Sequence, residues 1–257
     1  MRRKLGLGVP AAAALAFVSL AQAEDSVESP HSTSANFGVY SQYVFRGLTQ
    51  TNEDPALQGG FDYWHASGFY AGTWLSNISW FSDLNPGNSV SLEWDTYAGF
   101  RKTWAEAQEL VTDVGFLHYE YPGSYPSPAH GILKPHTDEV YVGLGWKWAA
   151  LKYSYAVSDL FGIPDCEGSS YLDLTVTIPL PKSFSIALHA GKQTYEGGNN
   201  DELFGYEDYR TTLSYAFGDG WTTSATYTHS TAKDAGYTIL GNNIGDDQFV
   251  LAISRAL

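Results

Sequence analysis

The chain has 257 residues, with 14 Lys and Arg against 28 Asp and Glu, and a formal charge of −14 at neutral pH. Such an acidic protein lacks the basic patch that nucleic-acid binding needs, so we expect no nucleic acid among its partners. A single cysteine, Cys166, excludes an internal disulfide framework and a thiolate metal cluster. Glycine, tyrosine and tryptophan are abundant while methionine occurs once, a composition that favours many strands and few helices.

The N-terminus has the three parts of a secretory signal peptide. A basic start, Arg2 to Lys4, precedes a short apolar run and an A-x-A cleavage site that ends at Ala23. We therefore expect residues 1–23 to be a signal peptide that is removed on export.

The rest of the chain has no stretch that would cross a membrane as a helix. The best candidate, Val140 to Phe161, is interrupted by Lys147 and Lys152. An exported chain without a spanning helix is either soluble or a β-barrel. Residues 24–34 are largely polar and aperiodic, so we expect a flexible periplasmic lead-in before one domain over residues 35–257.

Alternating side chains and turn residues predict twelve strands. The first has Phe37, Val39 and Phe45 on an apolar face and Arg46 on a polar face. In chain order the predicted strands are 36–46, 56–65, 69–80, 89–103, 109–120, 138–148, 150–158, 169–180, 183–194, 205–217, 221–231 and 247–257.

The connections between these strands alternate between long and short without exception. The long ones are residues 47–55, 81–88, 121–137, 159–168, 195–204 and 232–246. The short ones are residues 66–68, 104–108, 149, 181–182 and 218–220. A soluble sandwich has no reason to place every long loop at one end, whereas outer-membrane barrels have short periplasmic turns and long external loops. The sequence therefore predicts an all-β fold, a transmembrane antiparallel up-and-down β-barrel of twelve strands.

The side chains along these strands fit a barrel with lipid outside and water inside. In residues 169–180, Leu174 and Val176 alternate with Asp173 and Thr175. Tryptophans near the strand ends predict two aromatic girdles. The periplasmic girdle would contain Trp104, Trp148 and Trp221, and the external girdle Trp80 and Trp94. Core tryptophans at the strand ends of a soluble barrel are the alternative.

The predicted inward face carries both signs of charge. We interpret the following as pore-lining residues: Arg46, Asp62, Glu93, Asp95, Arg101, Lys147, Lys152, Asp173 and Arg210. The fifth strand adds Asp113 in one of two registers, because Val114 and Phe116 compete with Val111 and Leu117 for the outward face. Buried charges are costly unless they are paired or hydrated, so the lumen is either a hydrated channel or is closed by salt bridges.

The segment VFRGLTQTNEDPALQGGFDYWHASGFYAGTWLSNISW, residues 44–80, resembles the start of proteobacterial TorF-family porins, also called the Gcw_chp family. The matching pieces are Phe45-Arg46-Gly47, Leu48-Thr49-Gln50, Asp54-Pro55-Ala56, Gln58-Gly59-Gly60-Phe61-Asp62-Tyr63 and the segment 68–74. The likeness continues more weakly to the C-terminus. It implies an outer-membrane protein that forms a pore, and it carries over no catalytic residue. The last strand ends in Leu257, where outer-membrane proteins commonly present an aromatic residue to the assembly machinery.

No motif in the chain points to catalysis or to a bound cofactor. The GxSxG, HExxH, Walker A and EF-hand patterns are absent. The seven histidines are scattered without the spacing of metal ligands, so we expect no metal site. An enzyme in the barrel wall would need a serine–histidine pair, for which His229 and Ser230 are the candidates. An interfacial aromatic belt is the simpler explanation of His229, and we expect no catalytic residue.

Together these features predict a porin of the outer membrane that allows passive diffusion of small polar or charged solutes through a water-filled lumen. A structural or adhesive barrel with a plugged lumen is the main alternative, followed by a lipid hydrolase in the barrel wall. The expected partners are outer-membrane lipid, the solutes and, during biogenesis, the barrel-assembly machinery. Neither the solute nor the oligomeric state follows from the sequence.

Overall fold

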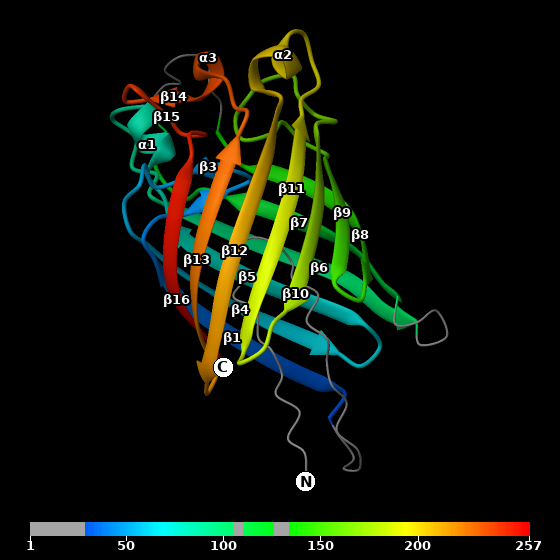
Figure 1. The fold of residues 1–257 in the computed structure, drawn as a ribbon. Coiled ribbons are helices and arrows are strands. Elements are labelled where there is room, and N and C mark those ends of the chain that lie inside the picture. The colour runs from blue at the N-terminus through cyan, green and yellow to red at the C-terminus, as the bar shows by residue number, and fades with distance from the viewer. Residues whose placement is uncertain (1–28, 105–109, 126–133) are drawn as a thin grey trace.

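The computed structural model describes residues 29–104, 110–125 and 134–257 (Figure 1). Twelve strands form a closed barrel in which neighbours pair antiparallel, and the pairing of β1 with β16 completes the ring. The wall strands are β1 (His31–Tyr40), β4 (Ala56–His65), β5 (Phe69–Asn77), β6 (Leu92–Trp104), β7 (Leu110–Glu120), β8 (Thr137–Trp146), β9 (Ala149–Ala156), β10 (Ser170–Pro179), β11 (Phe184–Thr194), β12 (Tyr206–Gly218), β13 (Trp221–Ser230) and β16 (Gln248–Ala256). The predicted fold is confirmed.

The long connections lie at one end of the barrel and carry the remaining elements (Figure 1). These elements are β2 (Val44–Phe45), β3 (Leu48–Thr49), α1 (Trp80–Leu84), α2 (Asn200–Phe204), α3 (Asp234–Tyr237), β14 (Thr238–Ile239) and β15 (Asn242–Asn243). Within the described residues no helix has the length and apolarity needed to cross a membrane. The predicted signal peptide lies outside the described residues.

Side chains alternate between an apolar outer face and a polar inner face. On β16, Phe249, Leu251 and Ile253 are exposed on the outside, while Gln248 and Ser254 are buried. A barrel wall that exposes apolar groups outward and buries polar groups inward is the pattern of a membrane-spanning barrel. On β7 the register left open by the sequence is resolved, because Val114 and Phe116 face outward and Asp113 faces inward.

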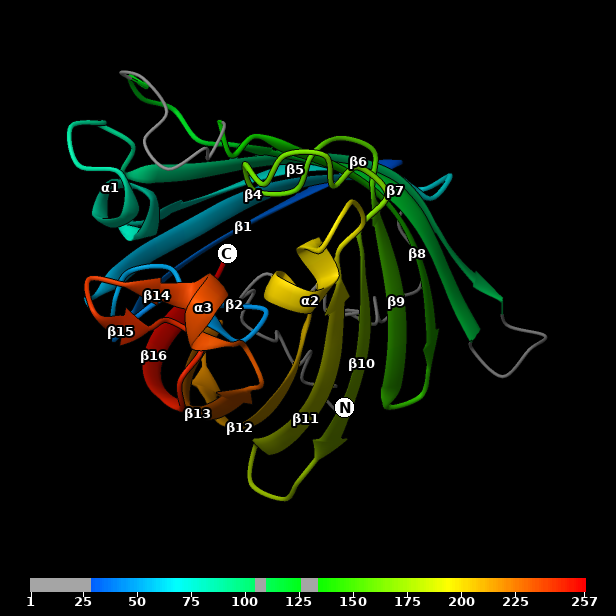
Figure 2. The same ribbon diagram turned by 90° about the horizontal axis from the view of Figure 1, so that it is seen from above.

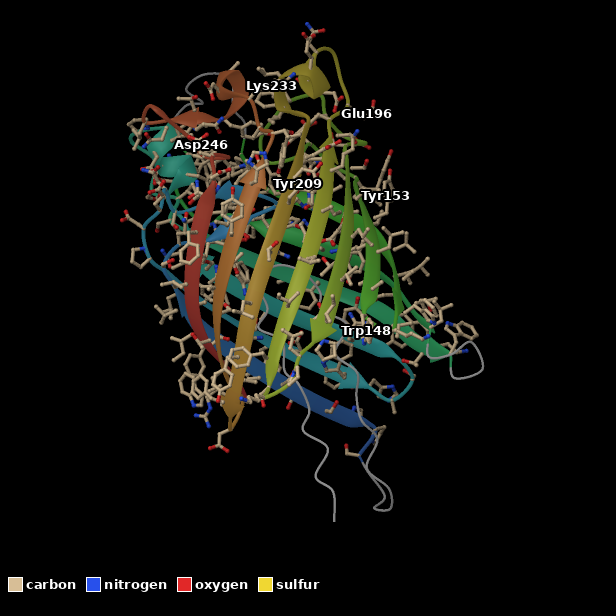
Figure 3. The ribbon with its side chains drawn as sticks, viewed as in Figure 1. Trp148, Tyr153, Glu196, Tyr209, Lys233 and Asp246 are labelled. Atoms are coloured by element: carbon tan, nitrogen blue, oxygen red, sulfur yellow. The ribbon has the colours of Figure 1, made fainter. Side chains whose placement is uncertain are left out.

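Aromatic side chains gather on the outer surface near both ends of the barrel (Figure 3). Trp104 and Trp148 are exposed at the end that carries the short turns, and Trp94 is exposed near the other end. The assignment of Trp80 to the external girdle is wrong. Strand β5 ends at Asn77, and Trp80 begins α1 in the following loop, where its ring packs against Phe81 and Tyr121.

The first strand is the main difference from the predicted boundaries. It spans His31–Tyr40 instead of residues 36–46, because the pairing with β4 already begins at His31, opposite His65. The last residues of the expected lead-in therefore belong to the wall. At the other end the chain leaves the wall after Tyr40, and the apolar residues that follow turn into the barrel interior.

Substitutions on the two faces of β12 test this orientation. Leu213 faces outward, whereas its neighbour Thr212 faces inward and its hydroxyl lies 2.9 Å from that of Thr226. Leu213→Arg places a charge in hydrocarbon and should lower the free energy of unfolding in lipid vesicles by about 2–4 kcal/mol. Thr212→Arg should cost much less, because its side chain extends into the lumen. Equal losses in urea titrations followed by tryptophan fluorescence would contradict the assignment of the faces.

Candidate functional site

The connection between β1 and β4 folds into the lumen, where Figure 2 shows β2 inside the ring of wall strands. Strands β2 and β3 pair antiparallel around the two-residue turn Arg46-Gly47. Both turn residues have positive φ, 46° and 78°, as a type I′ turn requires. Residues 43–51 are called the hairpin below.

Aromatic packing holds the base of the hairpin against the wall. The Tyr43 ring lies 5.3 Å from that of Trp74 on β5, and the Phe45 ring lies 5.8 Å from that of Tyr119 on β7. Tyr43 is 1% exposed, and its hydroxyl donates a 2.8 Å hydrogen bond to the Glu93 carboxylate. Side chains that would face lipid in a wall strand are therefore buried inside the barrel.

Arg46 joins the hairpin tip to the far side of the wall. Its guanidinium donates to the Glu139 carboxylate on β8 at 2.8 Å and to the Gln193 side chain on β11 at 3.0 Å. The same group lies over the Tyr171 ring of β10, 4.3 Å from its centroid. The charge is thus paired, hydrogen-bonded and stacked, which is what a buried arginine needs to be stable.

Gly47 allows the hairpin tip to approach β12 and β13. A Cβ atom at this position would lie 2.6 Å from the Asp208 Cβ and 3.1 Å from the Ser230 Cβ. The positive φ is also unfavourable for residues other than glycine. A larger residue at position 47 must therefore move the tip away from the wall.

The long loops cover the hairpin from above. The Thr49 amide donates to the Ile244 carbonyl at 2.8 Å, and the Gln50 carbonyl accepts from the amides of Ser79 and Trp80. Leu48 packs in a buried cluster with Ile239 and other residues of these loops. The hairpin and these loops therefore occupy the lumen at the end of the barrel that carries the long connections.

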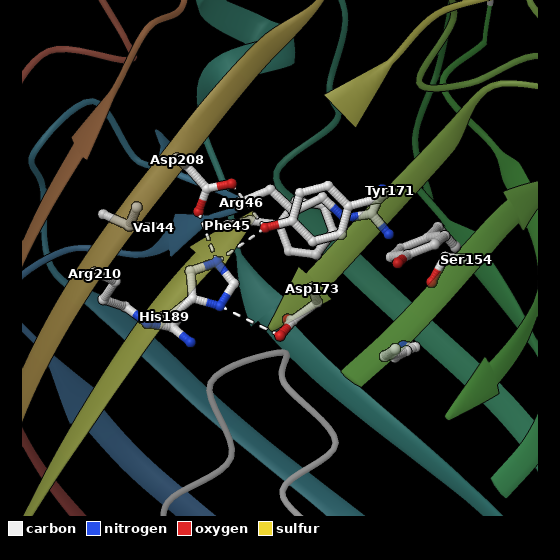
Figure 4. Close-up of a pocket in the computed structure, with 11 residues that line it drawn as sticks. Val44, Phe45, Arg46, Ser154, Tyr171, Asp173, His189, Asp208 and Arg210 are labelled. Atoms are coloured by element: carbon white, nitrogen blue, oxygen red, sulfur yellow. Dashed lines mark hydrogen bonds and ion pairs between the residues drawn. The ribbon is translucent and has the colours of Figure 1, made fainter. Parts of the chain in front are cut away.

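A small cavity of about 30 Å³ lies beside the hairpin and is lined by the hairpin and by residues of the β9 to β12 wall (Figure 4). His189 occupies its centre between two carboxylates. Its Nε2 lies 2.9 Å from Asp208, and its Nδ1 lies 3.3 Å from Asp173. Asp208 also accepts a 2.7 Å hydrogen bond from the Tyr171 hydroxyl. The acidic groups of this wall are thus satisfied by protein donors.

A second ionic network lines the β5 to β8 wall. Arg101 on β6 donates two hydrogen bonds to Asp113 on β7, at 2.7 and 3.1 Å. The Tyr70 hydroxyl on β5 donates to the other Asp113 oxygen at 2.7 Å and contacts the hydroxyl of Tyr141. Charged groups therefore line the interior on both sides of the hairpin tip.

The amino-acid sequence matches a known protein family. The family described as "Bacterial protein of unknown function (Gcw_chp)" matches residues 24–257. The chain belongs to the Gcw_chp family. The resemblance found in residues 44–80 is thereby confirmed for the family. No curated protein sequence matches the chain.

Solved structures with a similar fold include porins. A KdgM porin has 10% sequence identity and a TM-score of 0.52, covering 86% of this chain and 98% of the porin. A NanC porin has 13% identity and a TM-score of 0.50, covering 88% of this chain and 98% of the porin. At such low identities the similarity shows the fold that this Gcw_chp protein shares with them.

Most of the predicted pore-lining residues lie inside the barrel of this Gcw_chp protein. Those with inward side chains are Arg46, Asp62, Glu93, Asp95, Arg101, Lys152, Asp173 and Arg210. Arg46 comes from the hairpin and not from a wall strand. Only part of the set comes together, because Arg46, Lys152, Asp173 and Arg210 share one cavity while Arg101 lies in the network on the β6 to β7 wall. Their role in transport stays a prediction.

Lys147 is the exception among the predicted residues. It occupies the turn between β8 and β9 with φ of 54°, and its side chain is exposed. Its ammonium lies over the outward-facing Trp146 ring, 4.2 Å from the centroid. Because β8 ends at Trp146, the alternation that points Lys147 inward no longer applies, and its placement on the inner face is wrong.

Several charged residues of the interior were missed by the sequence argument. Glu139, His189 and Asp208 all lie on inward positions and form the contacts described above. Strand alternation was sufficient to find them, since Asp208 shares a face with Arg210 and Glu139 shares a face with Tyr141. The ion pair of Glu139 with Arg46 could not be found in this way.

The serine–histidine pair considered for an enzyme is not assembled. His229 faces outward, with its Nδ1 2.6 Å from an Asp247 oxygen, whereas Ser230 faces inward. Among the described residues no group of His, Cys, Asp and Glu is placed to hold a metal ion. Cys166 is buried in its loop, and this burial raises the pKa of the thiol, which disfavours the reactive thiolate.

The Arg46–Glu139 pair can be tested by removing one partner or both. Arg46→Met and Glu139→Gln each leave an unpaired buried charge, which costs about 3–5 kcal/mol. Amide exchange in the hairpin should then accelerate by roughly a hundredfold or more, as measured by mass spectrometry. The double variant should exchange more slowly than either single variant.

The control for this test is Lys192→Met, which breaks an exposed ion pair with Glu207 at 3.6 Å on the outer face. Exposed pairs contribute little, so hairpin exchange should not change. Wild-type exchange in both single variants would show that the pair does not hold the hairpin.

Proposed function

We propose that this protein is an outer-membrane channel through which small polar and charged solutes diffuse passively. The observation that supports it best is the charged inner face of the wall. Arg101, Lys152 and Arg210 point into the lumen from β6, β9 and β12, whereas the outward positions of the wall are mainly apolar. Charged side chains on the inner face of a membrane-spanning barrel are typical of a lumen that contains water.

The hairpin is the proposed constriction of this channel. It crosses the lumen from β1 to the opposite wall. Arg46 holds its tip through Glu139, Gln193 and the Tyr171 ring, and Gly47 allows the close approach to the wall. Because the tip at Gly47 touches β12 and β13, a solute would pass when the tip moves away from the wall, so the hairpin sets the size and charge of what can pass.

The porin neighbours support a channel on this fold. One related structure is described as a KdgM porin in complex with disordered oligogalacturonate, with 10% identity and a TM-score of 0.53. We extend to the present protein the idea that charged, water-soluble molecules enter the lumen. Outer-membrane lipid would contact the apolar outer face, and the barrel-assembly machinery would insert the barrel.

A plugged barrel with a structural or adhesive role is the second candidate. The observation that favours it is the tight aromatic packing of Tyr43 and Phe45 against Trp74 and Tyr119. In that case the hairpin is a permanent closure and the external loops are the functional surface.

Gly47→Val distinguishes the two candidates. The added side chain collides with β12 and displaces the hairpin tip, which should raise the conductance in planar bilayers several-fold. Gly241→Val is the matched control, because Gly241 also has positive φ, 89°, but its Cβ would meet nothing within 4 Å. A wild-type protein that does not conduct while Gly47→Val does would identify the hairpin as a plug. If neither conducts, the channel proposal fails.

Protease access tests the proposed location. A cleavage site inserted after Gly198, in the loop that contains α2, should be cut on intact cells, since the long loops would face outward. The same site inserted after Lys182, in a short turn, should be cut only after the outer membrane is permeabilised. The reverse pattern would contradict the orientation.

A further inference from the structure

The place that Arg46 occupies on the wall has the features of a binding site for a guanidinium group. Three strands supply its sides: the Glu139 carboxylate on β8, the Tyr171 ring on β10 and the Gln193 amide oxygen on β11. The two oxygens accept hydrogen bonds from separate nitrogens of the guanidinium. Figure 4 shows the Arg46 side chain beside the Tyr171 ring. Two acceptors and an aromatic face match a planar cation that carries several donors.

Contacts within the wall hold this site in place without the hairpin. The Gln193 side-chain nitrogen donates to two backbone carbonyls at 3.1 and 3.2 Å, which leaves its oxygen to accept from the guanidinium. The Tyr171 hydroxyl donates a 2.7 Å hydrogen bond to Asp208 and so fixes the ring. Glu139 also accepts from the Tyr119 hydroxyl at 3.2 Å. We therefore expect the site to keep its shape when the arginine leaves.

The site needs another cation when the hairpin tip moves away from the wall. Arg46 is the only charged residue of residues 43–51, so movement of the tip leaves the buried Glu139 carboxylate without its ion pair. The neighbouring Lys152 does not fill this place, since its ammonium lies over the Tyr141 ring, 4.4 Å from the centroid. A buried charge without a partner is strongly unfavourable. A solute that supplies the missing cation therefore favours the state in which the tip is released.

The inner face of the wall also favours a cation over an anion. Among the described residues, its inward cations are Arg101, Lys152 and Arg210. Its inward carboxylates are more numerous and include Glu93, Asp95, Asp113, Glu139, Asp173 and Asp208. Displacement of Arg46 increases this imbalance at the wall. A surplus of carboxylates in the lumen concentrates cations and disfavours anions.

We propose that the wall site of Arg46 is the binding site of the solute, and that the solute is a small cation with a guanidinium group. Arg46 acts as a tethered copy of this group that holds the passage closed, and the free solute displaces it and releases the hairpin tip. The charged group of the solute takes the space that Arg46 vacates. The inference rests on the proposed channel for the route by which the solute arrives, but binding can be measured without transport.

Calorimetric titration of the purified full-length protein in detergent tests the site. The probe is methylguanidinium, and methylurea is its planar, uncharged match. Methylguanidinium should bind Arg46→Ala roughly tenfold or more tightly than the wild-type protein, because the variant has no arginine that competes for the site. Glu139→Gln, added to Arg46→Ala, should weaken this binding by roughly ten- to a hundredfold through the loss of a charged hydrogen bond. Methylurea should give no measurable heat.

Arg255→Ala is the matched control, because it makes the same substitution at an arginine on the outer face, beside the Trp221 ring. This variant should have the wild-type affinity for methylguanidinium. Heat-modifiable migration on gels verifies that each variant is folded. Equal affinities of Arg46→Ala and the wild-type protein, or equal tightening in Arg255→Ala, would overturn the proposed site. Tighter binding of methylammonium than of methylguanidinium to Arg46→Ala would overturn the assignment to guanidinium compounds.

The wild-type protein gives a second readout that needs no variant. Methylguanidinium should accelerate amide exchange in residues 44–49, because the released tip is open to solvent. Methylurea and sodium chloride at the same concentration should not change this exchange. Exchange that is the same in all three solutions would show that the solute does not displace Arg46.

Bilayer recordings separate this inference from the channel proposal. In a conducting protein, methylguanidinium should raise the conductance above that in sodium chloride of equal concentration. Arg46→Ala should abolish this increase, because its tip is already released. A protein that conducts but responds equally to methylguanidinium and methylurea retains the channel and loses the site. A protein that binds methylguanidinium as described but never conducts retains the site and loses the channel.

Discussion

The pairing of β1 with β16 is the constraint on which the rest of the structure depends. In a bilayer every backbone amide and carbonyl must be bonded within the protein, so a sheet can cross the membrane only if its edges meet. Closure divides the side chains of each strand between an outer and an inner environment. Because hydrocarbon disfavours charged groups, many charged residues of the strands lie in the lumen, where they form the networks around Asp113 and His189.

The closed wall therefore brings charged side chains close together in the lumen. Charges brought together in a confined space are stable when each has a partner or water. Here several acids have a cationic partner, as in Arg46 with Glu139 and Arg101 with Asp113, and tyrosine hydroxyls donate further hydrogen bonds, as in Tyr171 to Asp208. The tyrosines thus stabilise carboxylates without adding charge to the lumen.

Most of the wall could be predicted from the sequence, because strand alternation and loop lengths are local properties. The register of Leu174 and Asp173, for example, follows from their own neighbours. The hairpin could not be predicted in the same way. Tyr43 and Phe45 continue the alternation of apolar residues that begins in β1, although the wall strand ends at Tyr40. The sequence pattern is therefore the same whether these side chains face outward from a strand or inward from a hairpin. The turn Arg46-Gly47 also lacks the Asn-Gly or Asp-Gly signal that marks most type I′ turns. The partners of Arg46 lie far along the chain, and only the closed barrel brings them within reach.

That separation in sequence has a consequence for assembly. Residue 46 lies in the first connection of the barrel, whereas Glu139 and Gln193 belong to strands that are synthesised and inserted much later. The buried contacts of the hairpin can form only once the sheet has curved far enough to bring the opposite wall into range. Contacts between residues so far apart in sequence form late, because the chain must lose its loop-closure entropy before these contacts can form. A barrel that is still open at the β1–β16 seam would therefore leave Arg46 unpaired and the hairpin accessible to proteases.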